Sequence, residues 1–138
     1  MRMLLFVVLA LCGCKGAPAR DASPDSAADH PKPALTAMAM LPGIRAHLDS
    51  VAADPSMMRS AMAGHQAEVK ALVEAMHADM MAAGMHSDAA YEALADSVVK
   101  GSAALGTASG PDFERLVAEH VDQMRRLAAV YESKAAAM

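Results

Sequence analysis

Aromatic residues are scarce in this chain of 138 residues: there is no Trp, and Tyr and Phe occur twice each. So low a content of aromatic and β-branched residues argues against a β-sandwich or β-barrel. Basic residues are not in excess either, because 12 Lys and Arg stand against 16 Asp and Glu, which gives a net charge of −4. Without a basic surface, the sequence gives no support for binding to nucleic acid.

Both cysteines of the chain follow an apolar run, Met3–Leu11, that is too short to span a bilayer. Arg2 precedes this run, an arrangement typical of an export signal. The run ends in Leu11-Cys12-Gly13-Cys14, which resembles a bacterial lipobox. The resemblance implies that residues 1–13 are a signal peptide and that Cys14 becomes the acylated N-terminus. The alternative is an ordinary secretory signal whose cysteines are incidental.

A lipid anchor at Cys14 places the expected mature protein at the cell envelope of a bacterium. Several acyl chains on one residue hold a protein stably at a membrane. By the usual sorting rule, Lys15 after the modified cysteine favours the outer membrane, with the protein facing the periplasm. No cysteine follows Cys14, so disulfides, zinc–thiolate sites and cysteine nucleophiles are excluded. Residues 14–34 are rich in Pro, Ala, Asp and Ser and predict a flexible linker.

Alanine dominates the rest of the chain, and the whole sequence contains 13 Met. Apolar residues recur at alternating spacings of three and four, as they do on one face of an amphipathic helix. Four such segments with short connections predict an all-α, antiparallel four-helix bundle over residues 35–138. The residues expected to face its core are Leu41, Ile44, Leu48, Val51, Met58, Met62, His65, Val69, Leu72, Met76, Tyr91, Leu94, Val98, Leu105, Phe113, Val117, His120, Met124, Leu127 and Tyr131.

Residue types that commonly begin or end helices fall between these segments. They are Asp54-Pro55 before the second helix, Gly84 at its end, Ser87-Asp88 before the third helix and Pro111-Asp112 before the fourth. Gly101–Gly110 is rich in Gly, Ser and Thr and predicts a loop. Pro42-Gly43 lies inside the first segment, which is therefore expected either to bend there or to begin there.

His65 and His120 occupy core-facing positions at similar heights of the second and fourth helices. These helices are diagonal in the predicted bundle, about 13–14 Å apart if neighbours are about 10 Å apart. Two inward imidazoles at this separation are able to meet or to share a ligand. The alternative is that each histidine is bonded to a polar neighbour or to water.

Two more elaborate cofactor sites are not expected in this bundle. Haem is disfavoured because Cys-x-x-Cys-His is absent and few aromatic residues are available to line a pocket. A carboxylate-bridged di-metal site needs two Glu-x-x-His motifs and two further inward glutamates. The sequence has one such motif, Glu74-Ala-Met-His77, and it lies beside the core-facing positions, so this site is excluded.

A second set of candidate ligands lies near the end of the second helix: His77, Met80, Met81, Met85 and His86. His77-Ala-Asp-Met80 has the H-x-x-M spacing and Met62-Ala-Gly-His65 has its reverse, so each pair shares a helix face. Thioethers bind the soft ions Cu(I) and Ag(I). The spacing resembles the repeated motifs of periplasmic silver- and copper-binding resistance proteins. The candidate metal ligands are therefore His77, Met80, Met81, Met85, His86, Met62, His65 and His120. The alternative is that the methionines fill the core.

No arrangement typical of an enzyme is present, since the sequence has no Gly-rich phosphate loop, no paired inward carboxylates and no nucleophile beside a base. As a whole, residues 35–138 resemble Met/His-containing, Ala-rich helical lipoproteins of the bacterial envelope, which are mostly uncharacterised. We therefore expect a non-catalytic interaction or structural role, with envelope proteins as partners. The alternative function is the binding or buffering of Cu(I) or Ag(I) on the periplasmic side of the membrane.

Overall fold

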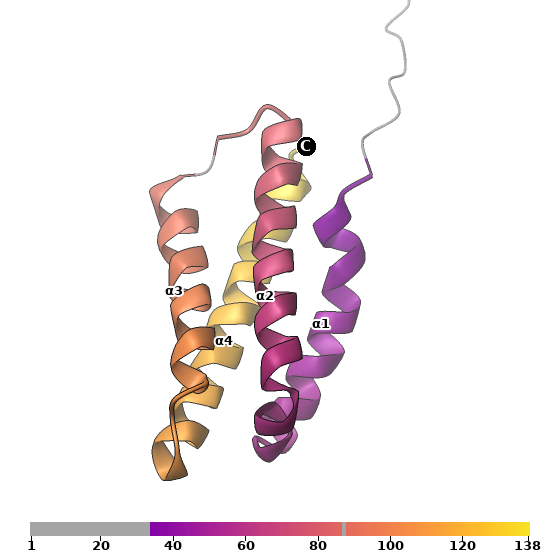
Figure 1. Ribbon diagram of the computed structural model, residues 1–138. Coiled ribbons are helices and arrows are strands. Elements are labelled where there is room, and N and C mark those ends of the chain that lie inside the picture. Colours follow the sequence, from indigo (N-terminus) through magenta and orange to yellow (C-terminus); the bar gives the residue numbers. More distant parts are fainter. Residues whose placement is uncertain (1–33, 87) are drawn as a thin grey trace, which may run out of the picture. The chain divides into compact units, whose positions relative to one another are not determined.

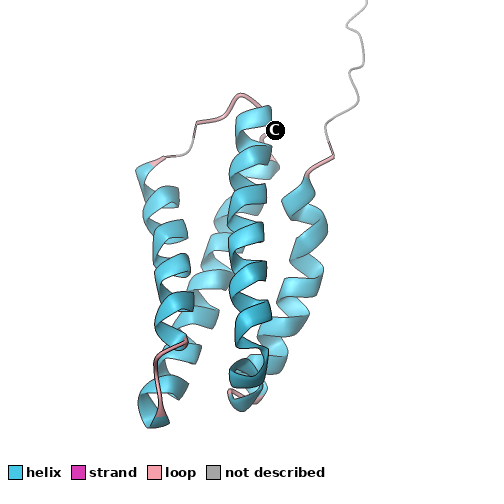
Figure 2. Cartoon of the chain, in the orientation of Figure 1, coloured by secondary structure: helices cyan, strands magenta, loops and turns pink. Residues whose placement is uncertain are grey.

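The computed structural model describes residues 34–138 with the exception of residue 87, and four helices account for most of them. They are α1 (Thr36–Ala53), α2 (Ser56–Ala82), α3 (Ala89–Leu105) and α4 (Gly110–Ala135). This part of the chain contains no β-strand (Figure 2), so the predicted all-α four-helix bundle is confirmed. The expected signal peptide, the acylated Cys14 and nearly all of the linker lie outside the described residues.

The four helices form an antiparallel bundle in which α1 and α3 each contact both α2 and α4 (Figure 1). α2 and α4 are diagonal, as the sequence predicts, and they also touch across the centre. Two surface ion pairs of 2.6 Å, Arg45–Glu132 and Asp49–Arg125, connect α1 to α4. Over residues 34–138, no described helix combines the length and the apolar character needed to cross a membrane.

The core is built from the residues that the three–four spacing places on one face of each helix. In α1 and α4, every residue of the predicted core face is buried, whereas Met62 of α2 and Leu94 of α3 are half-buried. Burial of these apolar side chains is the main term that stabilises the bundle. The largest fully buried side chains are Tyr91, Tyr131, Leu41, Leu48, Met58, Leu72, Met76, Met80, Leu105, Met124, Leu127 and His120.

The ends of α2 and α3 are fixed by the residues that the sequence indicates. Gly84 follows α2 with a φ of 70°, a left-handed conformation that glycine adopts without strain. The turn is completed by the N–H of Met85, which donates to the carbonyl of Met80 at 2.9 Å. Asp88 caps α3 by accepting a hydrogen bond of 2.8 Å from the backbone N–H of Tyr91.

The prediction of a loop over Gly101–Gly110 is wrong for its first half, because α3 continues to Leu105. Ser102 and Leu105 are buried in this last turn and extend the inward face of the helix. This burial outweighs the low helix propensity of Gly101, which amounts to about 1 kcal/mol relative to alanine. The loop is accordingly short, and α4 begins at Gly110.

α1 begins at Thr36, well before Pro42, which lies inside the helix; the expectation that it begins at Pro42 is wrong. Asp79 of α2 accounts for the earlier start. Its carboxylate accepts hydrogen bonds from the backbone N–H groups of Thr36 at 3.1 Å and of Ala37 at 2.8 Å. The hydroxyl of Tyr131 donates to the same carboxylate at 2.6 Å. One buried side chain therefore joins the first turn of α1 to α2 and α4.

Candidate metal centre

His65 of α2 and His120 of α4 meet in the core. Their Nε2 atoms lie 2.8 Å apart, and the rings meet edge to face with centroids 5.0 Å apart. Both residues are almost fully buried, at 3% and 1% exposed, so the meeting that the sequence allows is observed. Because one neutral imidazole nitrogen must donate and the other accept, one hydrogen lies between the two rings.

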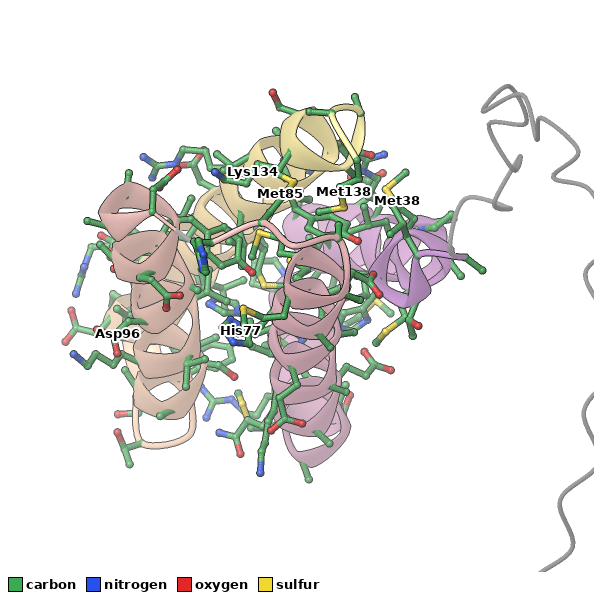
Figure 3. The ribbon with its side chains drawn as sticks, turned by 90° about the horizontal axis from the view of Figure 1, so that it is seen from above. Met38, His77, Met85, Asp96, Lys134 and Met138 are labelled. Carbon is green, nitrogen blue, oxygen red and sulfur yellow. The ribbon has the colours of Figure 1, made fainter. Side chains whose placement is uncertain are left out.

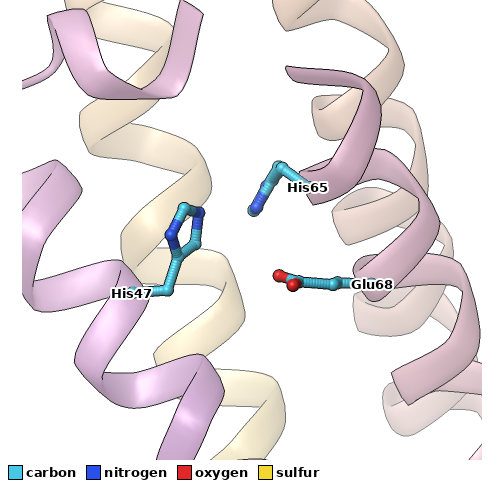
Figure 4. A group of neighbouring side chains, drawn as sticks. All are labelled: His47, His65 and Glu68. Atoms are coloured by element: carbon cyan, nitrogen blue, oxygen red, sulfur yellow. The ribbon is translucent and has the colours of Figure 1, made fainter. Parts of the chain in front are cut away.

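His47 of α1 extends this pair toward the surface. Its ring centroid lies 5.3 Å from that of His65. One ligand atom each from His47, His65 and Glu68 lie within 4.8 Å of one another. Figure 4 shows His65 and Glu68 reaching from α2 toward His47 on α1. His120 is outside this group of three and is connected to it through His65.

His47 and Glu68 are not among the residues that the sequence motifs indicate, although a signal for each is present. His47 follows Ile44 by three residues and precedes Val51 by four, so it lies on the border of the core face of α1. Glu68 follows His65 by three residues and therefore shares a face of α2 with it. Spacing along a single helix does not show that the face of α1 with His47 lies opposite the face of α2 with Glu68.

A pocket of about 330 Å³ opens onto the outer part of this group, between α1 and α2. Its lining consists of Met40, Gly43, Ile44, His47 and Glu68. A Cβ atom at Gly43 would have no heavy atom within 4 Å, so the wall of the pocket is open at this residue. An ion can reach the ligand atoms by this route while the helices stay packed, as a metal site requires.

Burial keeps the two inner histidines neutral at pH 7. Desolvation, together with repulsion from His120 and His47, lowers the pKa of His65 to about 4. Desolvation also lowers the pKa of His120 to about 4. A neutral imidazole has a free lone pair, so both rings are in the form that binds metal ions.

Three buried polar atoms in this region have no hydrogen-bond partner in the protein: Nε2 of His47, Nδ1 of His120 and Oε1 of Gln123. Buried polar atoms are nearly always paired in folded proteins, so each exception needs a reason. A metal ion bound beside His47 would give its Nε2 atom the partner that it lacks. The atoms of His120 and Gln123 both belong to α4.

The donor set of imidazole nitrogens and one carboxylate is suited to divalent transition-metal ions such as Zn(II), Cu(II) and Ni(II). In a tetrahedral site with bonds of about 2.0–2.1 Å, neighbouring ligand atoms lie about 3.3 Å apart. The ligand atoms in the structure lie within 4.8 Å of one another, so side-chain rotation alone can bring them to this spacing. Glu68 is exposed, and its carboxylate can rotate inward without repacking the core.

The structure distributes the other candidate ligands of α2 over different surroundings. Met80 is buried in the core at 1% exposed, whereas its neighbour Met81 is 51% exposed. His77 is exposed, and its Nδ1 lies 4.0 Å from a carboxylate oxygen of Glu92 on α3. Figure 3 shows His77 between α2 and α3 and Met85 farther along, toward the end of α4. These ligands therefore do not all face one point.

Two further candidates lie at the margins of the core. Met62 and Met85 are half-buried and pack against it, and His86 is exposed. Met62 is on the same helix as His65, but it belongs to the apolar packing of the bundle. Binding of Cu(I) or Ag(I) by residues 77–86 stays a prediction.

Within residues 34–138, His47, His65 and Glu68 are the one group of three or more His, Cys, Asp or Glu side chains placed closely enough to hold an ion. With His120 they form the candidate centre, which we call the His–Glu cluster. Its outer part faces the pocket and its inner part is buried. Comparison with known protein families, with curated proteins and with solved structures gives no match to this chain.

Proposed function

We propose that this chain is a lipid-anchored protein of the bacterial cell envelope whose helical bundle binds a divalent transition-metal ion at the His–Glu cluster. The observation that carries the proposal is the approach of ligand atoms from His47, His65 and Glu68 to within 4.8 Å of one another. The adjoining pocket supplies the route for the ion. The neutral state of His65 supports the proposal further, because no proton has to be displaced from a charged ring before the ion binds.

The surroundings of the cluster favour a role in carrying or buffering the ion over a role in holding the fold together. A continuous apolar core runs through all four helices, and its burial stabilises the fold independently of the cluster. Loading and release through the pocket leave that core in place. A protein of this kind keeps ions available, or keeps them bound, at the surface of a membrane.

The location is the part of the proposal that depends on the first residues of the chain. Leu11-Cys12-Gly13-Cys14 resembles a lipobox, and acylation of Cys14 would attach the bundle stably to a membrane. Lys15 favours the outer membrane. Mass spectrometry of the mature protein tests this part independently of metal binding.

Two other functions compete with this one. In the first, the bundle binds envelope proteins and no ion. In the second, Cu(I) or Ag(I) binds to His77, Met80, Met81, Met85 and His86 at the end of α2. The first predicts no metal affinity at all, and the second predicts an affinity that depends on thioethers and on monovalent ions, so one set of titrations separates the three.

The test is a competition titration of Zn(II), Cu(II) and Cu(I) against chelators, with the full chain in detergent micelles. We expect one divalent ion per chain and a loss of affinity of at least about 100-fold in His47→Ala, since loss of a supporting group alone costs about 10–100-fold. The matched control is His77→Ala/Met81→Leu, which removes an imidazole and a thioether outside the cluster and is expected to leave the affinity unchanged.

Two results would contradict the proposal. If the control variant lost its affinity while His47→Ala kept it, the ion would be bound at the end of α2. If the wild-type chain competed for none of the three ions, a role in binding envelope proteins would be the better account.

A further inference from the structure

The His–Glu cluster extends inward beyond His47 and Glu68, the two of its residues that line the pocket. Nε2 of His120 lies 2.8 Å from Nε2 of His65, so a third imidazole, which is the fourth donor group of the cluster, lies directly behind His65. On its other side, Nδ1 of His120 is buried without a partner, and so is Oε1 of Gln123 on the same helix.

These two unpaired atoms lie close to one point of α3. A Cβ atom at Gly101 would be 3.1 Å from Nδ1 of His120 and 3.1 Å from Oε1 of Gln123. Glycine at this position therefore lets the backbone of α3 approach His120 and enclose both atoms. A nitrogen that carries a hydrogen and an amide oxygen are a complementary donor and acceptor, so rotation of the Gln123 amide toward Nδ1 of His120 would pair them.

We propose that His120 is a fourth metal ligand of this site and that Gln123 is a positioning residue, which accepts the Nδ1 hydrogen of His120 and directs its Nε2 lone pair at the ion. The proposal rests on the proposed function, since it concerns the same ion. Metal-binding histidines in general donate their second ring N–H to a carboxylate, a carbonyl or water, which fixes the tautomer.

When an ion replaces the hydrogen bond between His65 and His120, the two rings together neither gain nor lose a hydrogen. Without an ion, Nε2–H of His65 donates to the lone pair of His120. With an ion, both Nε2 lone pairs face the metal, and His65 carries its hydrogen on Nδ1, so each ring keeps one hydrogen and stays neutral. The Nε2 atoms, now 2.8 Å apart, need to separate to about 3.3 Å for tetrahedral coordination.

Four donors of this kind define the class of ion. Three imidazole nitrogens and one carboxylate oxygen in tetrahedral geometry suit Zn(II), and Co(II) is its usual spectroscopic substitute. No thioether belongs to the set, so monovalent copper and silver are not favoured.

Visible absorption of Co(II) bound to the full chain in detergent micelles tests the proposal, because four-coordinate Co(II) absorbs much more strongly than six-coordinate Co(II). We expect the strong spectrum for the wild type. His120→Gln is expected to weaken Co(II) binding at least about 10-fold and to lower the absorption. Gln123→Leu should weaken it about 10–100-fold, and Gln123→Glu, which keeps an acceptor oxygen, should restore both the affinity and the spectrum.

His77→Gln is the control, since it changes an exposed histidine outside the cluster, and it should alter neither reading. If His120→Gln and Gln123→Leu keep the wild-type affinity and spectrum, the proposal is overturned, while ion binding by His47, His65 and Glu68 stands. If the wild-type chain binds neither Co(II) nor Zn(II), both the proposed function and this inference fail. Should His120→Gln not fold, the pair of Gln123 variants decides the question.

Discussion

Replacement of Asp79 by alanine is expected to lower the free energy of unfolding by about 3 kcal/mol or more. The carboxylate accepts hydrogen bonds from the N–H groups of Thr36 and Ala37 and from the hydroxyl of Tyr131. Bonds to a charged group contribute about 1.5–3 kcal/mol each, and removal of the acceptor leaves its donors unpaired. Burial and the bond to Asp79 raise the pKa of Tyr131, so its hydroxyl keeps its hydrogen at neutral pH.

Urea unfolding followed by the helical circular dichroism signal measures this effect. Asp96→Ala is the matched control, because Asp96 lies on the surface of α3 and its ion pair with Lys100 is exposed. We expect the control to change the free energy of unfolding by no more than about 0.5 kcal/mol. Similar losses in the two variants would mean that Asp79 does not join α1 to the rest of the bundle.

Acidification is expected to destabilise the ion-free bundle between about pH 6.5 and pH 4. The pKa of an unfolded histidine is about 6.5, and the pKa values of His65 and His120 in the folded protein are both lowered to about 4. Between these values the unfolded chain binds more protons, so the free energy of unfolding falls as the pH falls and levels off below about pH 4. For one histidine, this difference between the unfolded and folded pKa corresponds to about 3 kcal/mol of free energy of unfolding. We expect the bundle to lose at least this much on acidification.

The double variant His65→Leu/His120→Leu separates this effect from the titration of surface carboxylates. Replacing both partners of a buried hydrogen bond by apolar groups is close to neutral for stability, so the variant should fold at pH 7. Its free energy of unfolding should depend much less on pH over this range. Equal pH dependence in the variant and the wild type would show that the two histidines are not buried in their neutral form.

The features that could be predicted from the sequence are those that a single helix already contains. The three–four spacing of apolar residues identified the core face of each helix, and chain order made α2 and α4 diagonal. These two facts make a meeting of His65 and His120 possible, and the structure shows that it occurs. Their pairing needed no knowledge of side-chain detail, since both residues lie on the core face at similar heights.

The features that could not be predicted depend on which faces of different helices meet. Asp79 is polar and lies beside the core face of α2, and its role becomes visible only once the first turn of α1 is placed next to it. His47 and Glu68 are brought together in the same way. The low helix propensity of Gly101 predicts a loop residue, whereas its lack of a side chain allows close packing against His120.

Methionine shows a similar limit of spacing arguments. Met80 and Met81 are adjacent and both match the spacing of soft-metal motifs, yet one is buried in the core and the other is exposed. Spacing along a helix shows which residues share a face. Whether that face is buried depends on how the neighbouring helices pack against it.

X-ray absorption fine structure of the Zn(II)-loaded full chain reports the atoms bonded to the ion and so tests directly whether the His–Glu cluster holds it. We expect nitrogen and oxygen neighbours at about 2.0–2.1 Å, with the multiple-scattering pattern of three imidazole rings and with no sulfur. His47→Ala should lower the imidazole count by one, and His77→Ala should leave it at three. Sulfur neighbours, or an imidazole count that falls in His77→Ala and not in His47→Ala, would show that the ion is bound elsewhere.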